Sequence, residues 1–384
     1  MKHKLARLVA WRSASSTTTA NEFVDDDDGG PITVLFCPKA ARSVLTGPQP
    51  VVTKDEFQKS PFYALLGAEW LAYLDGPAHL KRRRQVIQLL RRTHERIDWR
   101  EYQTKLLVTL RRLFISGGVT DLFGTLAVFS SYQLGRALFG DGYTTELNRH
   151  VRAVWSAMND IADADVHGPA GASYDSAGFN SQALDLRARL NAILPPQSRL
   201  GMSRRALLDS HVGLLFASQD TSASAATTAV CLASGEPTTD LGGPALDELI
   251  VKALRACPPA PLLYRVIDKR IAVISPYVLR NELANFHTPG GILAASDQLF
   301  VFGAGTHRCA GDRMALSEIA AMLGAIRALP GAHVLPDEFP DLEARIVLRP
   351  KGVVQIMADA EDEASGSSLS SPLPGHLHPD TGKG

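Results

Sequence analysis

Residues 302–311 read Phe302-Gly303-Ala304-Gly305-Thr306-His307-Arg308-Cys309-Ala310-Gly311, with one cysteine among three glycines. An amphipathic helix is predicted to follow, because Leu316, Ile319, Leu323 and Ile326 recur at helical spacing and Pro330-Gly331 then ends the pattern. Cys309 therefore falls at or just before a helix N-terminus, where exposed N–H groups and the helix dipole favour a thiolate over a thiol. Because glycines let the backbone approach a large flat group, this loop suits a metal better than a disulfide.

Five positions of the loop, Phe302, Gly305, His307, Cys309 and Gly311, match the pattern Phe-x-x-Gly-x-His-x-Cys-x-Gly. The loop resembles the cysteine-ligand loop of the cytochromes P450, the haem-thiolate monooxygenases. Thiolate ligation pushes electron density onto haem iron and favours O–O cleavage. The resemblance implies that Cys309 is the axial ligand of haem b and that Phe302, His307 and Gly311 help to hold the cofactor. The alternative is a buried cysteine in a glycine-rich turn before an ordinary helix.

The composition narrows the class of protein. Among 384 residues, 40 are basic and 40 are acidic, so no global charge favours nucleic acid or an anionic membrane. The four cysteines lie far apart without C-x-x-C spacing, which excludes a zinc ribbon and gives no disulfide framework. A reducing cytoplasm is the expected compartment. The apolar run at residues 5–11 is too short for a signal peptide, and no segment is long enough to span a bilayer.

Residues 1–30 are predicted to form a disordered lead-in, residues 31–358 a single domain, and residues 359–384 a disordered tail. Strands are expected only near the ends of the domain: at residues 32–36, at residues 51–53, and as a hairpin in which residues 346–348 and 353–357 flank Pro350-Lys351-Gly352. The fold class is therefore predicted to be mainly α with small peripheral β-sheets. This agrees with the cytochrome P450 fold that the resemblance implies.

A second motif opens a helix at Asp75-Gly76-Pro77-Ala78-His79. Arg83 lies four residues after His79, so the two side chains share one helix face. The resemblance implies that His79, Arg83, Arg265 and His307 bind the haem propionates, and the planar fork of arginine suits a carboxylate. The alternative is a solvated basic start of a helix.

Other basic residues of this helix cannot all face inward: Lys81, Arg82, Arg84, Arg91 and Arg92. The resemblance implies that this basic patch receives an acidic ferredoxin or flavodoxin, which with its reductase supplies electrons. A solvated helix face is the alternative.

A third motif lies within a long apolar helix that Ser203 is predicted to cap. Asp220 and Thr221 follow each other there, and such polar groups are costly in an apolar helix unless each has a partner. The resemblance implies that the Thr221 hydroxyl bends the helix over the oxygen site and that the pair delivers protons. Ser218 stands where glycine is commoner in the family. The alternative is an Asp-Thr helix cap in mid-chain.

The sequence departs from the family at residue 252. The family carries Glu-x-x-Arg on this helix, but Lys252 stands three residues before Arg255 and would repel it. Glu248 lies on the same helical stripe, and we predict that it partners Lys252, Arg255 or both.

These motifs predict a haem-thiolate monooxygenase that uses O2 for oxidative tailoring of a small organic molecule, a secondary metabolite. Two alternatives stay open: an enzyme that forms a C–S or C–C bond in a natural product, and a degenerate non-catalytic homologue that binds or recruits a partner. Lys252 supports the second alternative.

Overall fold

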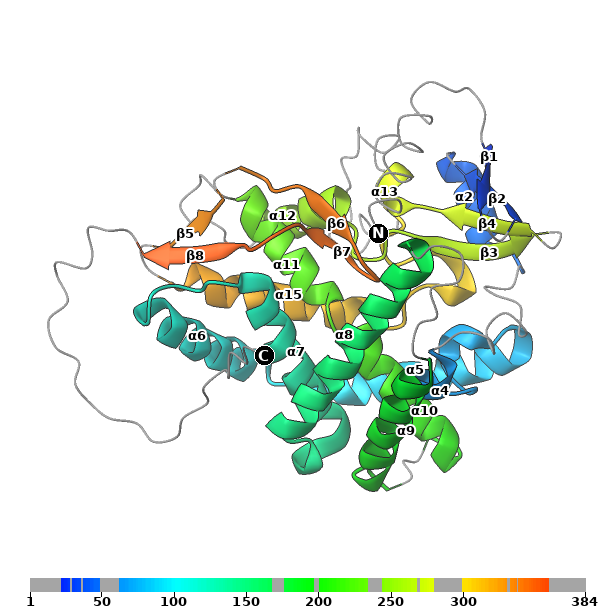
Figure 1. Ribbon diagram of the computed structural model, residues 1–384, viewed down its shortest axis with the longest axis horizontal. Coiled ribbons are helices and arrows are strands. Elements are labelled where there is room, and N and C mark those ends of the chain that lie inside the picture. The colour runs from blue at the N-terminus through cyan, green and yellow to red at the C-terminus, as the bar shows by residue number, and fades with distance from the viewer. Residues whose placement is uncertain are drawn as a thin grey trace, which may run out of the picture.

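Helices make up most of the computed structural model, which describes residues 22–27, 30–35, 37–48, 62–167, 176–196, 200–233, 244–267, 270–279, 299–329, 332–336 and 338–358 (Figure 1). The α-helices are α2 Pro38–Thr46, α4 Tyr63–Leu66, α5 Gly76–Arg96, α6 Trp99–Ile115, α7 Leu122–Phe139, α8 Thr145–His167, α9 Ser176–Ala192, α10 Arg204–Ala217, α11 Thr221–Leu232, α12 Pro244–Ala256, α13 Pro276–Leu279 and α15 Asp312–Arg327. No helix in these described ranges has the length and apolar character needed to cross a membrane.

Three small sheets lie at the periphery of the helices (Figure 1). The first has the order β1-β2-β4-β3, with β1 Glu22–Asp27, β2 Gly30–Leu35, β4 Arg270–Ile274 and β3 Leu263–Ile267. The second pairs β5 Ala332–Leu335 with β8 Gln355–Ala358, and the third pairs β6 Leu342–Ala344 with β7 Leu348–Pro350. The predicted fold class, mainly α with small peripheral sheets, is confirmed.

Strand β1 lies within the segment that the sequence predicts to be disordered. Its residues pair antiparallel with β2 from Glu22 opposite Leu35 to Asp27 opposite Gly30. Strand β2, predicted at residues 32–36, pairs on its other side with β4 in parallel. Without β1, β2 would present a row of unpaired N–H and C=O groups at the sheet edge. Residues 22–27 thus form a paired strand despite their acidic composition. Residues 1–21, 51–53 and 359–384 lie outside the described residues.

The predicted C-terminal hairpin is wrong. Strands β7 and β8 follow each other in the chain and are joined through the turn at Gly352, as in a hairpin. They nevertheless do not pair with each other. The reason is that the two strands serve different parts of the core: Leu348 packs with the cluster beside the first sheet, whereas Val354 and Ile356 pack with the central cluster. Val119 donates to and accepts from Ile356 at 2.8 and 3.0 Å, which fixes β8 beside the end of α6.

Two helices cross the centre of the molecule, α11 and α15 (Figure 1). Residues 222–231 of α11 are all buried, and most of them are alanine, serine or threonine, whose small side chains allow neighbouring helices to approach closely. The four apolar residues that predict α15 are buried, so the periodicity signal is confirmed. The Ser203 hydroxyl accepts from the Ala206 N–H at 3.1 Å and caps α10 as predicted.

Candidate functional site

The loop around Cys309 is held by its own backbone. The Cys309 N–H donates to the Phe302 carbonyl at 2.7 Å, and the Gly303 N–H donates to the Phe300 carbonyl at 2.8 Å. Gly303 and Gly305 have φ angles of +70° and +68°, which a side chain would strain. Helix α15 begins three residues after Cys309, as predicted, and the Gly311 N–H points at Sγ over 3.4 Å.

The electrostatics of Cys309 differ from the prediction. Burial raises the pKa of the thiol, and Asp312 acts in the same direction. The Gly311 N–H and the guanidinium groups of Arg83 and Arg308 oppose this effect without overcoming it. The protein alone therefore favours the thiol, because loss of solvation outweighs the helix N-terminus. A metal ligand must be deprotonated, so a bound cation would have to supply the missing stabilisation of the thiolate.

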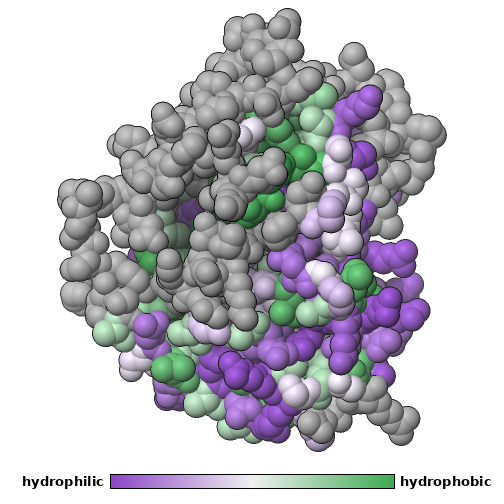
Figure 2. All heavy atoms as spheres, turned by 90° about the vertical axis from the view of Figure 1, so that its right-hand side faces the viewer, coloured by the Kyte–Doolittle hydropathy of each residue, from purple (hydrophilic) through white to green (hydrophobic). Residues whose placement is uncertain are grey.

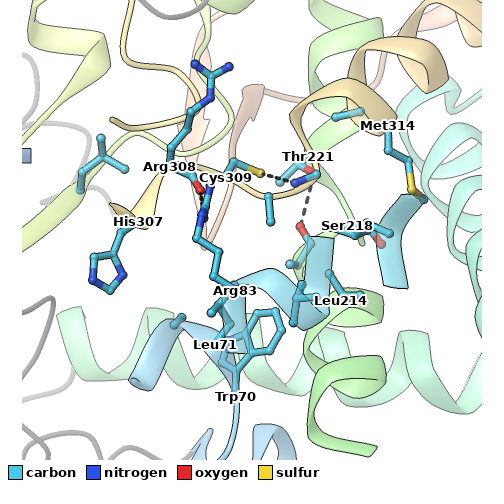
Figure 3. A pocket seen from close by; sticks show the side chains of 18 of the residues that line it. Trp70, Leu71, Arg83, Leu214, Ser218, Thr221, His307, Arg308, Cys309 and Met314 are labelled. Atoms are coloured by element: carbon cyan, nitrogen blue, oxygen red, sulfur yellow. Dashed lines mark hydrogen bonds between the residues drawn. The ribbon is translucent and has the colours of Figure 1, made fainter. Parts of the chain in front are cut away.

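Cys309 is exposed to two adjoining cavities of about 370 and 280 Å³. Thr221, Arg265, His307 and Cys309 line both cavities, so the two form one space between the helices α10–α11 and α15. Apolar residues of several elements complete the wall of the larger cavity: Trp70, Leu71, Val86, Leu90, Leu134 and Leu214. Figure 3 shows Arg83 reaching toward Arg308 beside Cys309, with Thr221 on the neighbouring helix.

Five basic residues line the larger cavity, and four of them are those assigned to the propionates: His79, Arg83, Arg265 and His307; the fifth is Arg308. The rings of His79 and His307 lie 3.9 Å apart, and His307 Nε2 is 3.2 Å from the Asp75 carboxylate. Arg83 Nη1 donates to the Arg308 carbonyl at 2.5 Å. The structure thus brings to one cavity the four residues that the resemblance assigns to the propionates, which come from α5, β3 and the cysteine loop.

The basic cluster is short of negative charge. Burial, together with neighbouring basic groups, lowers the pKa of His79 and of His307 to about 4. Burial also lowers the pKa of Arg265, which is 4% exposed and donates from Nη1 to its neighbour's carbonyl at 2.7 Å. Its Nε atom is buried without a hydrogen-bond partner among the described residues. A ligand with two carboxylates and a metal that accepts one thiolate fits this set, so the residues present are compatible with haem b.

The predicted long central helix is interrupted at residues 218–220. The side chains of Ser218 and Gln219 both donate to the Leu215 carbonyl, at 3.0 and 2.8 Å, and so compete with the helical bonds. Helix α11 then restarts at Thr221, whose hydroxyl is 3.4 Å from the Ala217 carbonyl. The break lies where the sequence predicts a bend.

Asp220 and Thr221 face different surroundings. Thr221 lines both cavities, whereas Asp220 lines neither. The Asp220 carboxylate instead accepts from Arg152 Nη1 at 2.6 Å and from Trp155 Nε1 at 2.7 Å, both on α8. The structure therefore separates the two members of the predicted pair. The Thr221 hydroxyl lies at the cavity, whereas the Asp220 carboxylate lies away from it and is paired with the Arg152 guanidinium.

The atypical residue Lys252 forms an ion pair with Glu248, with Nζ and Oε1 3.0 Å apart, which confirms one of the predicted pairings. The side chains are 63% and 67% exposed, however. The pair lies on the solvent face of α12, so it does not rebuild the buried network that the family's glutamate would make.

Replacing Glu248 by glutamine is expected to change the free energy of unfolding by less than about 0.5 kcal/mol, because exposed i,i+4 ion pairs contribute about 0.3–0.5 kcal/mol. Thermal unfolding beside the control Asp247→Asn measures the difference. A loss of several degrees in Tm for Glu248→Gln alone would show that this pair is worth more than its exposure indicates.

One feature of the cavity was not predicted from the sequence. Glu318 lines the larger cavity from α15 although it is an acid on a buried helix face. The sequence does contain a signal for the burial of Glu318. Ala315 and Met322 lie three residues before and four residues after it, so position 318 belongs to an apolar stripe of the helix. Trp70 lies against α10 at Gly213, where an added Cβ would stand 2.0 Å from the indole ring.

No protein-family model and no curated protein matches this sequence. The structure is similar to solved cytochromes P450. CYP175A1 from Thermus thermophilus has 22% sequence identity and a TM-score of 0.71, over 93% of this chain and 95% of that chain. The haem domain of cytochrome P450DA has 10% identity and a TM-score of 0.73, over 91% and 92%. CalO2 has 17% identity and a TM-score of 0.63, over 88% and 92%.

The arrangement is thus that of a mainly helical protein with a cysteine loop beneath a broken central helix. The likeness covers nearly the whole of each chain, and the fold is the cytochrome P450 fold.

Proposed function

We propose that this chain is a haem-thiolate monooxygenase that carries out O2-dependent oxidation of a small organic molecule, with secondary metabolites as the substrate class. The observation that carries the proposal is the position of Cys309 just before α15, where it faces a cavity lined by five basic residues. When bound, haem b would supply activation of O2 with two electrons from a redox partner.

Different residues of the chain would bind the iron and the two carboxylates of haem b. Cys309 Sγ would hold the iron, and the Gly311 N–H aimed at Sγ would stabilise the thiolate. His79, Arg83, Arg265 and His307 would hold the two carboxylates, and Arg265 Nε would gain the partner that it lacks among the described residues. Phe302 lines the smaller cavity and Gly311 the larger one, which supports their assignment to the cofactor loop.

Reduction in the presence of carbon monoxide tests this proposal. A thiolate-ligated haem gives a strongly red-shifted absorbance band, and we expect this band in the purified protein. Absence of bound haem would instead favour the non-catalytic homologue that Lys252 suggested, and a band at the position typical of histidine ligation would remove Cys309 from its role.

Thr221→Ala is expected to leave the carbon monoxide band and ligand binding intact while diverting reducing equivalents to hydrogen peroxide. The reason is that Thr221 is the hydroxyl of the predicted pair that lines the cavity, and groups that manage protons typically contribute about 10²–10⁴-fold. The peroxide formed per reductant consumed measures this, with Thr104→Ala on the exposed face of α6 as the control. Equal peroxide yields in the two variants would assign Thr221 to helix structure.

The exposed basic residues of α5 support a docking site for an acidic ferredoxin or flavodoxin. Lys81, Arg84, Arg91 and Arg92 are exposed. Figure 2, which looks at the side of the molecule that carries α2, α4 and α5, shows hydrophilic residues gathered over its lower part.

Replacing Arg91 and Arg92 by glutamate is expected to slow reduction by a ferredoxin about tenfold or more at low salt, because opposite charges steer association. The difference should shrink at physiological ionic strength, where the Debye length is about 8 Å. Stopped-flow reduction at two salt concentrations measures it, with Arg149→Glu on α8 as the matched control. Equal rates for both charge reversals would contradict the docking site.

A further inference from the structure

One wall of the larger cavity comes from the segment 65–72, which runs from the end of α4 into the 3₁₀ helix η1 Leu71–Tyr73. Trp70 and Leu71 of this segment line the cavity. Figure 3 shows both side chains near Leu214 of α10, which also lines it. An apolar wall limits the bulk of a bound molecule. The contacts that hold residue 70 in place therefore also fix the space that a ligand can use.

An ion pair between Arg187 on α9 and Asp209 on α10 binds the backbone of this segment at two points. Arg187 Nη1 donates to the Leu65 carbonyl at 2.6 Å, and the Glu69 N–H donates to Asp209 Oδ2 at 2.9 Å. The Asp209 side chain is fully buried, and that of Arg187 is 15% exposed. Gly67 lies between the two bonds, and a Cβ added to it would stand 2.3 Å from the Asp209 carboxylate. The turn therefore rests directly on the ion pair.

A second basic side chain holds the same turn from α5. Arg82 Nη1 donates to the Glu69 carbonyl at 3.0 Å, and Arg82 Nη2 forms an ion pair with Glu69 Oε2 at 2.5 Å. Arg82 also donates to the Ala206 carbonyl of α10 at 3.4 Å. Glu69 is thus bound to two other helices through its N–H, its carbonyl and its carboxylate. It stands directly before Trp70 in the chain.

Trp70 packs against a place on α10 where a side chain is missing. Gly213 lies one helical turn after Asp209, so the two residues share one face of α10. A Cβ added to Gly213 would stand 2.0 Å from the Trp70 ring. Apolar packing alone is non-directional, whereas charge-assisted hydrogen bonds to two backbone groups specify one position of the segment. Asp209 therefore fixes the backbone that carries the indole ring.

We propose that Asp209 and Arg187 are positioning residues that select substrates by size. They clamp residues 65–69 and thereby hold Trp70 at the cavity, so that bulky molecules are excluded. This inference rests on the proposed function and names the residues that limit its substrates. The molecules admitted are apolar and of limited bulk, because Trp70 and Leu214 present apolar surface to them. An ion pair that bonded only to itself would add stability without setting this geometry, but here each partner spends a further bond on the segment.

Replacing both partners together tests the clamp, because the loss of one partner alone leaves an uncompensated buried charge and endangers the fold. The double variant Arg187→Met/Asp209→Ala, the clamp variant, removes the ion pair and both of its bonds to the segment. The double variant Arg189→Met/Asp185→Ala is the matched control, because it removes an ion pair of α9 whose side chains are 55% and 51% exposed. Both variants are expected to give the carbon monoxide band of the wild type.

Binding of imidazole and of 1-tritylimidazole to the holoprotein, followed by the haem absorbance, measures the room at the cavity. Imidazole is small, whereas the three phenyl rings of the trityl group need additional space. The clamp variant is expected to gain about tenfold or more in affinity for 1-tritylimidazole relative to imidazole, the lower end of the discrimination that a hydrophobic pocket shows for one methylene. Trp70→Ala should raise this ratio as well, because it removes the wall itself. The control should keep the ratio of the wild type. An unchanged ratio in the clamp variant, or an equal rise in the control, would overturn the proposal.

Hydrogen exchange of the Glu69 amide gives a readout that does not need haem. This amide is bonded to Asp209 Oδ2 in the wild type. Because exchange requires that bond to open, it is expected to be faster in the clamp variant, while the amides of α9 and α10 keep their wild-type rates. Equal rates for the Glu69 amide in the two proteins would refute the clamp. Faster exchange spread evenly over α9, α10 and the segment would assign the ion pair to general stability and would also refute it.

The carbon monoxide band of the wild type separates the two levels of the argument. A wild-type protein without that band refutes the proposed function itself, and the exchange of the Glu69 amide then still decides whether the clamp exists. A wild-type protein with the full band, together with a clamp variant whose azole ratio is unchanged, refutes only the selection by Asp209 and Arg187.

Discussion

Replacing Cys309 by alanine is expected to abolish the red-shifted carbon monoxide band and the activity, while the protein still folds. Cys309 lies between two cavities and belongs to none of the core clusters formed by the described residues, so its loss leaves the packing of α15 intact. Loss of a residue that merely supports a metal ligand typically costs about 10–100-fold in metal affinity or activity, and loss of the ligand itself is expected to cost more. Absorbance spectra of the reduced protein with carbon monoxide measure the effect.

Cys257→Ala is the matched control. Cys257 is buried in the cluster beside the first sheet and lines neither cavity. Its replacement is expected to leave the carbon monoxide band in place with a small loss of stability. If the band survived in Cys309→Ala and disappeared in Cys257→Ala, the axial ligand would be Cys257 and the interpretation of the loop would be wrong.

Periodicity predicted α15 because its core-facing residues repeat with the helical period, and that period depends only on neighbours in the chain. The break between α10 and α11 was predictable for a similar reason, since Ser218 and Gln219 bond to a carbonyl within four residues. Pairing of β8 could not be predicted in this way. The turn at Gly352 is a local signal for a hairpin, but burial of Val354 and Ile356 against Val119 decided the partner.

In the candidate site, too, residues in local motifs could be predicted from the sequence, whereas features that depend on distant contacts could not. The residues of the cysteine loop, the α5 pair and Thr221 were found because each belongs to a short motif. Glu318, which no motif indicated, accepts hydrogen bonds from Tyr102 and Ser130, which lie 216 and 188 residues away in the sequence. The orientation of Asp220 likewise depends on α8, which no local pattern connects to it. Contacts between distant segments therefore decide which acid faces the cavity.

Gly305→Ala is expected to cost the most stability of any single change in the cysteine loop. Gly305 has a φ angle of +68°, and an added Cβ would stand 2.4 Å from the Leu45 carbonyl oxygen and 2.7 Å from the Thr46 Cα. Both are backbone atoms at the end of α2, so no side-chain rotation relieves the clash. Left-handed backbone costs an ordinary residue roughly 1–2 kcal/mol. Overpacking adds about 1–3 kcal/mol, for a combined loss of about 2–5 kcal/mol.

Gly303→Ala separates backbone strain from the clash. Its φ angle of +70° is nearly the same, but the nearest atom to its added Cβ is 3.8 Å away. This variant is expected to lose only the roughly 1–2 kcal/mol of the left-handed backbone. Thermal unfolding and the haem absorbance per protein should therefore rank wild type, Gly303→Ala and Gly305→Ala in that order. The large haem loss is expected in Gly305→Ala alone, because its loop must move away from α2 and carry Cys309 with it. Equal losses in the two variants would show that the contact with α2 does not position the cysteine.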